Sequence, residues 1–228
     1  MGSVSSKPSA VLWDMDGTLV DTEPYWMDAE TALVQSYGGT WSHEDALQLV
    51  GSGLIDSALI LQRYGVDMAP EAIVDHLTDE VAARLRADGV PFRPGARELL
   101  ADLREQGIPT ALVTMSMKRM ALDVVSLIDF TAFDLVLGGD EVARPKPFPE
   151  PYLHAAELLG VDILDAVVIE DSLTGVRAGR ASGAVTLGVP HIISLDGSDA
   201  HELWPTLDGR LTDDIRDLHS RFAKESTR

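Results

Sequence analysis

The chain has 228 residues, of which 45% are hydrophobic and 24% charged, a balance typical of a soluble globular protein with one large domain or a core domain carrying an insert. Its 37 acidic residues outnumber the 18 lysines and arginines, and the resulting net charge of −19 argues against binding to nucleic acid or to an anionic membrane. The absence of cysteine excludes disulfide bonds, a thiolate nucleophile and a zinc–thiolate cluster.

The first nine residues, 1–9, are expected to form a flexible leader. They are mostly small or polar and lack the apolar stretch of a signal peptide. No segment of the chain approaches the roughly 20 apolar residues that span a bilayer. We therefore expect a soluble, cytoplasmic protein.

An acidic pair follows the first apolar run of the chain. Residues 10–13 predict a short buried strand, and Asp14 and Asp16 come where this strand ends. In open α/β sheets, ligand sites gather beyond the carboxyl ends of the strands. There, one carboxylate can attack while the other moves a proton, or both can hold a hard cation. The simpler interpretation is a loop in which an aspartate caps a helix and Gly17 makes the turn.

The next part of the chain predicts helices only. Residues 24–37 are helical in composition and end at a Gly-Gly pair, and Ser42 is placed to cap a further helix. Helical periodicity resumes after residues 50–54 and again over residues 70–87. We expect an all-helical block that packs on its neighbour, because a block of this size buries little core by itself.

Strands and helices alternate after a proline-stiffened linker at residues 90–95. This alternation predicts a parallel sheet covered by helices on both faces, and therefore an α/β fold. The tail from Leu211 predicts an amphipathic helix. The expected strands are residues 109–114, 133–137, 166–170 and 184–187, and the expected helices are residues 96–106, 117–127, 147–159 and 173–182.

Polar residues follow each of the first four predicted strands, so that they meet at one edge of the sheet. The first strand delivers the acidic pair, and the others deliver Thr114-Met115-Ser116, Lys146 at a helix start, and Glu170-Asp171-Ser172. Thr114 and Ser116 could simply cap the next helix, and we expect Ser172 to be a helix cap.

This set of residues suits phosphoryl transfer to a carboxylate. Asp14 can form an aspartyl-phosphate, and Asp16 can protonate the leaving group and then activate water. Mg²⁺ can be held by Asp14, the backbone carbonyl of Asp16 and Asp171. Lys146, the Thr114 hydroxyl and the backbone amides that follow it, beginning with Met115, can bind the phosphoryl oxygens.

The same residues resemble the four motifs of the haloacid dehalogenase superfamily, from about Ala10 to Pro190. The resemblance implies a Rossmann-like core of residues 10–22 and 92–228, a helical cap of residues 23–91 inserted after the first strand, and dependence on Mg²⁺. It also implies Asp14 as nucleophile, Asp16 as acid/base, Thr114 and Lys146 as phosphate ligands, and Asp171 with Glu170 on the metal side. The matching segments are Asp14-Met15-Asp16-Gly17-Thr18, Thr114, Arg144-Pro145-Lys146-Pro147 and Glu170-Asp171-Ser172.

The cap resembles that of the phosphoglycolate phosphatase-like and β-phosphoglucomutase-like enzymes. Asp16 argues against the dehalogenase branch, which lacks an acid at this position. The mutase branch is disfavoured because it typically has a histidine shortly after the Asp-Thr pair, near the position of Trp26, and an arginine in the loop that here reads Gly51-Ser52-Gly53-Leu54-Ile55.

The resemblance and the residues together predict a Mg²⁺-dependent phosphatase. The expected partner is a small phosphorylated metabolite, either a sugar phosphate or a phosphoglycolate-like acid, and the expected assembly is a monomer or weak homodimer. A phosphomutase and a non-catalytic phosphate-binding regulator are the alternatives. Trp26 can equally pack inside the cap or line the cleft. Substrate choice is expected to depend on Glu23, Trp26, Gly51 and Leu54.

Overall fold

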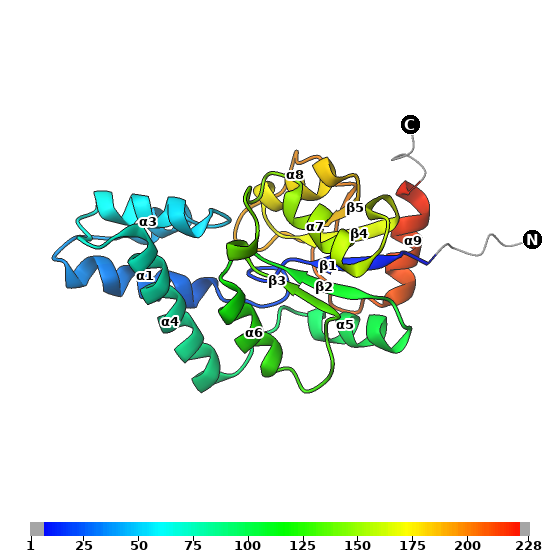
Figure 1. The fold of residues 1–228 in the computed structure, drawn as a ribbon, viewed down its shortest axis with the longest axis horizontal. Coiled ribbons are helices and arrows are strands. Elements are labelled where there is room, and N and C mark those ends of the chain that lie inside the picture. Colours follow the sequence, from blue (N-terminus) through cyan, green and yellow to red (C-terminus); the bar gives the residue numbers. More distant parts are fainter. Residues whose placement is uncertain (1–6, 224–228) are drawn as a thin grey trace, which may run out of the picture.

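The centre of the protein is a parallel β-sheet (Figure 1). The computed structural model describes residues 7–223. Within them, six strands pair in the order β3-β2-β1-β4-β5-β6, which confirms the predicted α/β, Rossmann-like core. The strands are β1 (Ala10–Trp13), β2 (Thr110–Val113), β3 (Leu135–Leu137), β4 (Ala166–Glu170), β5 (Val185–Gly188) and β6 (Glu202–Leu203).

The register of the three central strands brings their carboxyl ends to the same level. Trp13 of β1 is opposite Leu112 of β2 on one side and Ile169 of β4 on the other. Every residue of these three strands is buried, as expected for strands covered on both faces. The residues that follow Trp13, Val113 and Ile169 therefore emerge side by side.

Alternating side chains divide the interior into two layers. Val11 and Trp13 point into one layer, which contains helices α5 (Ala96–Glu105), α6 (Lys118–Ser126) and α9 (Thr212–Phe222). Ala10 and Leu12 point into the other, which is covered by α7 (Glu150–Leu159) and α8 (Leu173–Ser182). The period-two alternation of β1 thus separates the two hydrophobic layers.

Four helices inserted after β1 lie at one end of the sheet (Figure 1). The chain crosses into this helical insert and returns through adjacent segments, where the Asp21 amide donates to the Pro91 carbonyl at 2.7 Å and Val20 bridges Phe92. The helices are α1 (Glu23–Ser36), α2 (His43–Leu47), α3 (Leu54–Arg63) and α4 (Pro70–Asp88). Ser42 caps α2 with a capping box, as its sequence position predicted.

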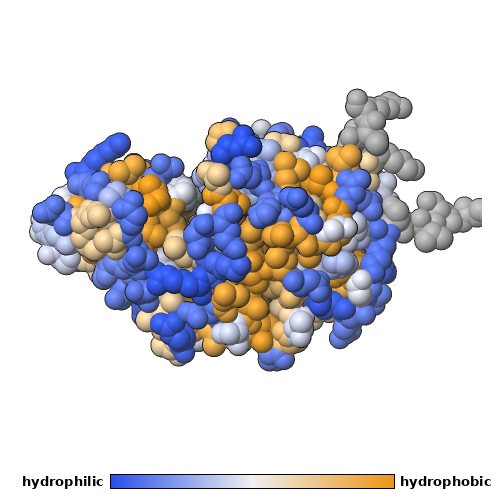
Figure 2. Space-filling model, viewed as in Figure 1, coloured by the Kyte–Doolittle hydropathy of each residue, from blue (hydrophilic) through white to orange (hydrophobic). Residues whose placement is uncertain are grey.

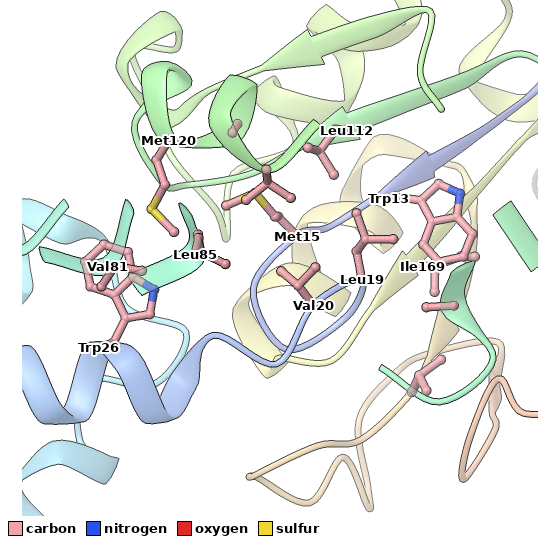
Figure 3. Packing of buried hydrophobic residues seen from close by; sticks show 14 of the residues in the cluster. Trp13, Met15, Leu19, Val20, Trp26, Val81, Leu85, Leu112, Met120 and Ile169 are labelled. Carbon is pink, nitrogen blue, oxygen red and sulfur yellow. The ribbon is translucent and has the colours of Figure 1, made fainter. Parts of the chain in front are cut away.

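One continuous hydrophobic cluster joins the insert to the sheet layer (Figure 3). Trp26 of α1 and Leu85 of α4 belong to the same cluster as Met120 of α6 and Met15 after β1. Ion pairs cross the same junction, including Arg119 Nη2 with Asp75 Oδ1 at 2.8 Å. The insert is therefore packed on the core, as its small size predicted.

The surface and the chain ends complete the description. Figure 2 shows polar residues over much of one face, with apolar side chains gathered over the core. Among residues 7–223, no helix is both long and apolar enough to cross a membrane. Most of the predicted leader lies outside the described residues, but Lys7 Nζ donates to the Gly107 carbonyl at 2.5 Å, and the Ser9 amide donates to the Asp165 carbonyl at 2.7 Å.

Several bounds differ from the sequence prediction by one or two residues, and two elements differ more. Strand β6 was not predicted, because two residues at a sheet edge carry no detectable periodicity. Helix α7 was predicted from Pro147 but begins at Glu150. Proline disfavours helical backbone in the residue before it, so the repeated prolines at 147 and 149 delay the helix, and the Phe148 amide instead closes a turn onto the Pro145 carbonyl at 3.0 Å.

Candidate active site

One buried lysine connects the ends of three neighbouring strands. Lys146 Nζ lies 2.6 Å from Asp14 Oδ1, which follows β1, and 2.6 Å from Glu170 Oε1, which ends β4. It also donates to the carbonyl of Val113, the last residue of β2, at 3.0 Å. Lys146 lies in the loop ahead of α7, so the prediction of a lysine at a helix start was wrong, although the loop brings it to the predicted edge of the sheet.

Three carboxyl groups crowd around this single ammonium group. Burial, and then the charge of Glu170, raise the pKa of Asp14 to about 7, although Lys146 opposes the rise. Burial and the charges of Asp14 and Glu170 raise the pKa of Asp171 well above its usual range. Burial lowers the pKa of Lys146, but Asp14 and Glu170 outweigh burial and raise it above its ordinary value. The site therefore carries an excess of negative charge.

This excess and its geometry suit a hard divalent cation. Asp14, Glu170 and Asp171 each offer one carboxylate oxygen, and these oxygens lie within 4.8 Å of one another. Mg²⁺ prefers oxygen ligands of this kind. The side chain of Asp16 lies outside this cluster, so Asp16 would contribute through its backbone carbonyl. The donor set thus fits the magnesium ion that the sequence predicted.

Two glycines make room for the acidic cluster. A Cβ atom on Gly17, whose φ is +84°, would lie 2.0 Å from Asp171 Oδ2. A Cβ atom on Gly175, in the first turn of α8, would lie within 1.9 Å of both Glu170 carboxylate oxygens. The close approach explains why these positions of the motifs require glycine.

Glu170 is held by more partners than its sequence position revealed. The Tyr152 hydroxyl on α7 donates to Glu170 Oε1 at 2.6 Å, and the Ser172 hydroxyl donates to Oε2 at 3.2 Å. Tyr152 also places its ring 5.1 Å from Lys146 Nζ. Tyr152 was not predicted as a site residue, because in the sequence a tyrosine inside a helix cannot be distinguished from a core residue. Ser172 also caps α8 as predicted, since it accepts from the Gly175 amide at 3.0 Å.

The Asp16 carboxylate lies outside the acidic cluster and accepts four hydrogen bonds. The hydroxyls of Thr114 and Ser116 donate to Oδ2 at 3.2 and 2.7 Å. Thr22, the residue before α1, and the indole of Trp26 in α1 donate to Oδ1, the indole at 3.2 Å. Asp16 is therefore held jointly by the core and the insert.

The loop after β2 supplies hydroxyl and amide groups to the same space. Thr114 Oγ1 accepts from the Ser116 amide at 2.9 Å, and α6 begins only at Lys118. Met115 Sδ accepts from the Lys146 amide at 3.3 Å, which ties this loop to the lysine loop. Ser116 was expected only as a possible cap, and the contact with Asp16 gives it a place in the site.

A cavity of about 90 Å³ lies between the core site and the insert. All four residues predicted to control substrate specificity line this cavity, namely Glu23, Trp26, Gly51 and Leu54. Glu30 of α1 and Ser57 of α3 also line it, although neither was predicted from the sequence. At its rim, Thr174 Oγ1 donates to the Gly51 carbonyl at 2.9 Å, so that insert and core touch. Trp26 fulfils both predicted alternatives, since it lines the cavity and packs in the hydrophobic cluster (Figure 3).

A parallel sheet with a helical insert after its first strand, and a buried acidic site at the strand ends, define a class of α/β hydrolases. A family model of haloacid dehalogenase-like hydrolases matches residues 8–183, and the chain belongs to this family. The resemblance stated from the motifs is thereby confirmed.

Relatives with described activities cover most of the chain. It is 33% identical over 195 residues to the phosphorylated carbohydrates phosphatase of Thermotoga maritima, covering 81% of this chain and 87% of the relative. It is 32% identical over 189 residues to hexitol phosphatase B of Escherichia coli, covering 79% and 83%. It is also 32% identical over 193 residues to the bifunctional riboflavin kinase/FMN phosphatase of Arabidopsis thaliana; the match covers 83% of this chain but 50% of that relative, so the chain spans about half its length.

Solved structures share the whole architecture. CbbY from Rhodobacter sphaeroides in complex with phosphate has a TM-score of 0.77 and 25% identity, covering 89% of this chain and 96% of that one. A putative β-phosphoglucomutase from Thermotoga maritima has a TM-score of 0.69 and 29% identity, covering 93% and 99%. The likeness therefore extends over both the sheet and the helical insert.

Proposed function

We propose that the chain is a Mg²⁺-dependent phosphatase that hydrolyses a small phosphomonoester through an aspartyl-phosphate on Asp14. Its family and the phosphatases among its relatives make it a phosphoric monoester hydrolase. The observation that carries the mechanism is the buried contact of 2.6 Å between Lys146 Nζ and Asp14 Oδ1, beside two further carboxylates. An ammonium group at this place can neutralise a phosphoryl group arriving at Asp14.

In the proposed mechanism each residue has one role. Asp14 attacks phosphorus, and the substrate oxygen leaves with a proton from Asp16. Asp16 then takes a proton from the water that cleaves the aspartyl-phosphate, which restores both carboxyl groups. Lys146, the Thr114 hydroxyl and the Met115 amide would bind the phosphoryl oxygens.

The metal would be held by Asp14, Asp171 and the Asp16 carbonyl, with Glu170 beside them. When bound, Mg²⁺ supplies charge neutralisation for the phosphoryl oxygens and aligns them with the nucleophile. Glu170 already accepts from Tyr152 and pairs with Lys146, so its main role in the proposal is to position the lysine.

A phosphomutase remains the second candidate, since one similar structure is a putative β-phosphoglucomutase. A mutase must also bind the second phosphate of a bisphosphate, and Lys146 is the only cationic side chain among the described residues that line the cavity. The phosphatase is therefore the better supported of the two.

The test is phosphate release from a panel of phosphomonoesters, with Mg²⁺ and with a chelator. We expect Mg²⁺-dependent release by the wild type, and loss of at least a thousandfold in kcat for Asp14→Asn. Asp217→Asn, at an exposed position, is the matched control. Conversion of β-glucose 1-phosphate into glucose 6-phosphate with little free phosphate would instead identify a mutase. Normal turnover by Asp14→Asn would refute the nucleophile.

A further inference from the structure

Two glutamates of the helical insert face the cavity from the same side of α1. Glu23 and Glu30 are seven residues apart, which is two helical turns and places them about 10 Å apart along one helix face. Both line the cavity and both are buried, with exposed fractions of 8% and 5%. Charged residues are seldom buried to this extent without a partner, so both need an explanation.

Glu30 has no hydrogen bond of good geometry to compensate for its burial, although the Trp41 indole N–H lies beside it. Among residues 7–223, its Oε2 atom accepts no hydrogen bond, and neither does the neighbouring Trp41 indole N–H find an acceptor of good geometry. A buried polar atom left in this condition lowers the stability of the folded chain. Because Glu30 also lines the cavity, a polar group of the substrate can supply the missing hydrogen bond.

Glu23 and Glu30 together form one wall of the cavity, and the electrostatics of this wall indicate what kind of group Glu30 contacts. Burial and the charge of Glu23 raise the pKa of Glu30 to about 8, with the Trp41 indole opposing the rise. Burial and the charges of Asp16 and Asp14 likewise raise the pKa of Glu23 to about 8. Near neutral pH the Glu30 carboxyl group is therefore largely protonated, and a protonated carboxyl group both donates and accepts.

No cation balances this wall. Among the described cavity-lining residues Lys146 is the only one that carries positive charge, and it is already paired with Asp14 and Glu170. If Glu30 is ionised it repels a second anionic group, and if it is protonated it offers no charge to balance one. Hydroxyl groups suit both states, since they can donate or accept.

We propose that Glu30, supported by Glu23, is a specificity-determining residue that binds the hydroxyl groups of an uncharged polyol or sugar chain whose phosphate lies at Asp14. This inference rests on the proposed phosphatase activity and narrows its substrate class. A chain anchored at Asp14 must reach past Glu23 to Glu30, so substrates of about six carbons are favoured over a two-carbon acid. Phosphoglycolate, which the sequence left open, becomes a poor substrate, and so do bisphosphates.

The experiment compares kcat/KM for sorbitol 6-phosphate, phosphoglycolate and fructose 1,6-bisphosphate in the presence of Mg²⁺. The wild type should prefer sorbitol 6-phosphate to both anionic esters by at least about tenfold, the equivalent of about 1.4 kcal/mol. Glu30→Leu should reduce the ratio of kcat/KM for sorbitol 6-phosphate to kcat/KM for the anionic esters about tenfold, because leucine can neither donate nor accept a hydrogen bond. Glu30→Gln, which keeps a neutral donor and acceptor, should restore most of it. Glu80→Gln, at an exposed position on α4, is the control.

A binding measurement separates recognition from chemistry. In an Asp14→Asn background, calorimetry should show that Glu30→Leu weakens binding of sorbitol 6-phosphate more than that of inorganic phosphate. Equal weakening of both ligands would point to a general structural effect and overturn the inference.

The two proposals fail in different ways. Absence of Mg²⁺-dependent release from every ester, p-nitrophenyl phosphate included, would refute the phosphatase itself. Turnover that favours phosphoglycolate or the bisphosphate, or a ratio unchanged in Glu30→Leu, would overturn the Glu30 inference alone. A preference for glucosamine 6-phosphate over glucose 6-phosphate would also overturn it, because it would show that the wall binds an ammonium group.

Discussion

The indole N–H of Trp26 donates to Asp16 Oδ1 at 3.2 Å across the junction between the helical insert and the sheet. Trp26 belongs to the first turn of α1, whereas Asp16 follows β1, so the contact couples the position of the insert to the proposed acid/base. Core hydroxyls hold the other oxygen of the same carboxylate. A displacement of the insert would therefore remove donors from Asp16.

Replacing Trp26 tests this coupling. Trp26→Phe keeps an aromatic ring in the hydrophobic cluster but removes the N–H, and a hydrogen bond to a charged group contributes about 1.5–3 kcal/mol. We expect kcat for phosphate release to fall about tenfold. Trp204→Phe, which removes an indole donor bonded to Glu202 at 2.7 Å near the far edge of the sheet, should leave kcat within about twofold. Equal losses in the two variants would contradict the coupling.

The ion pairs of Lys146 make a prediction about stability. Lys146→Met leaves Asp14 and Glu170 buried without their cation, and removing one partner of a buried pair costs about 3–5 kcal/mol. Chemical denaturation should show a loss of this size in the free energy of unfolding. Adding Glu170→Gln to this variant should recover part of it, because one uncompensated charge disappears. Additive losses in the double variant would argue against the pairing.

Gly17 tests the packing around Asp171. Gly17→Ala places a methyl group 2.0 Å from Asp171 Oδ2 at a φ of +84°, so the carboxylate must move. We expect Mg²⁺ binding measured by calorimetry to weaken at least tenfold. Gly38→Ala is the matched control, because its φ of +78° imposes similar backbone strain in open space. The control should lose about 1 kcal/mol of stability and no Mg²⁺ affinity.

Glu30 should make stability depend on pH. Its pKa is raised from 4.5 to about 8 in the folded chain, so the folded state holds this proton more tightly than the unfolded state. The contribution of this proton to the free energy of unfolding is fully present below about pH 4.5 and is lost as the pH rises to about 8. The melting temperature of Glu30→Leu should therefore exceed that of the wild type by a margin that grows over this range. A constant margin, as we expect for Glu80→Leu, would show that Glu30 does not titrate there.

Much of the core could be predicted because its elements carry local signals. Strand β4 and helix α8 have the predicted bounds, since a run of apolar residues forms the first and Ser172 and Gly183 cap the second. The start of α7 and the edge strand β6 could not be predicted, because proline turns and sheet edges depend on neighbours far along the chain.

The sequence by itself determined which side chains stand at the ends of the strands. An apolar run followed by Asp14 and Asp16 belongs to the local chain, and the parallel alternation places the later motifs at the same edge. For this reason the two carboxylates that pair with Lys146 in the structure, Asp14 and Glu170, could be named in advance.

Only the tertiary structure decided what those side chains touch. Tyr152, Ser116 and Glu30 lie on helices or loops where the spacing of residues predicts no more than packing or capping. In the structure, Tyr152 contacts Glu170, Ser116 contacts Asp16, and Glu30 lines the cavity. The burial that shifts the pKa of Asp14 and of Glu30 likewise arises from segments far apart in sequence. Electrostatic interactions depend on distance and exposure in space, and neither is a property of the local chain.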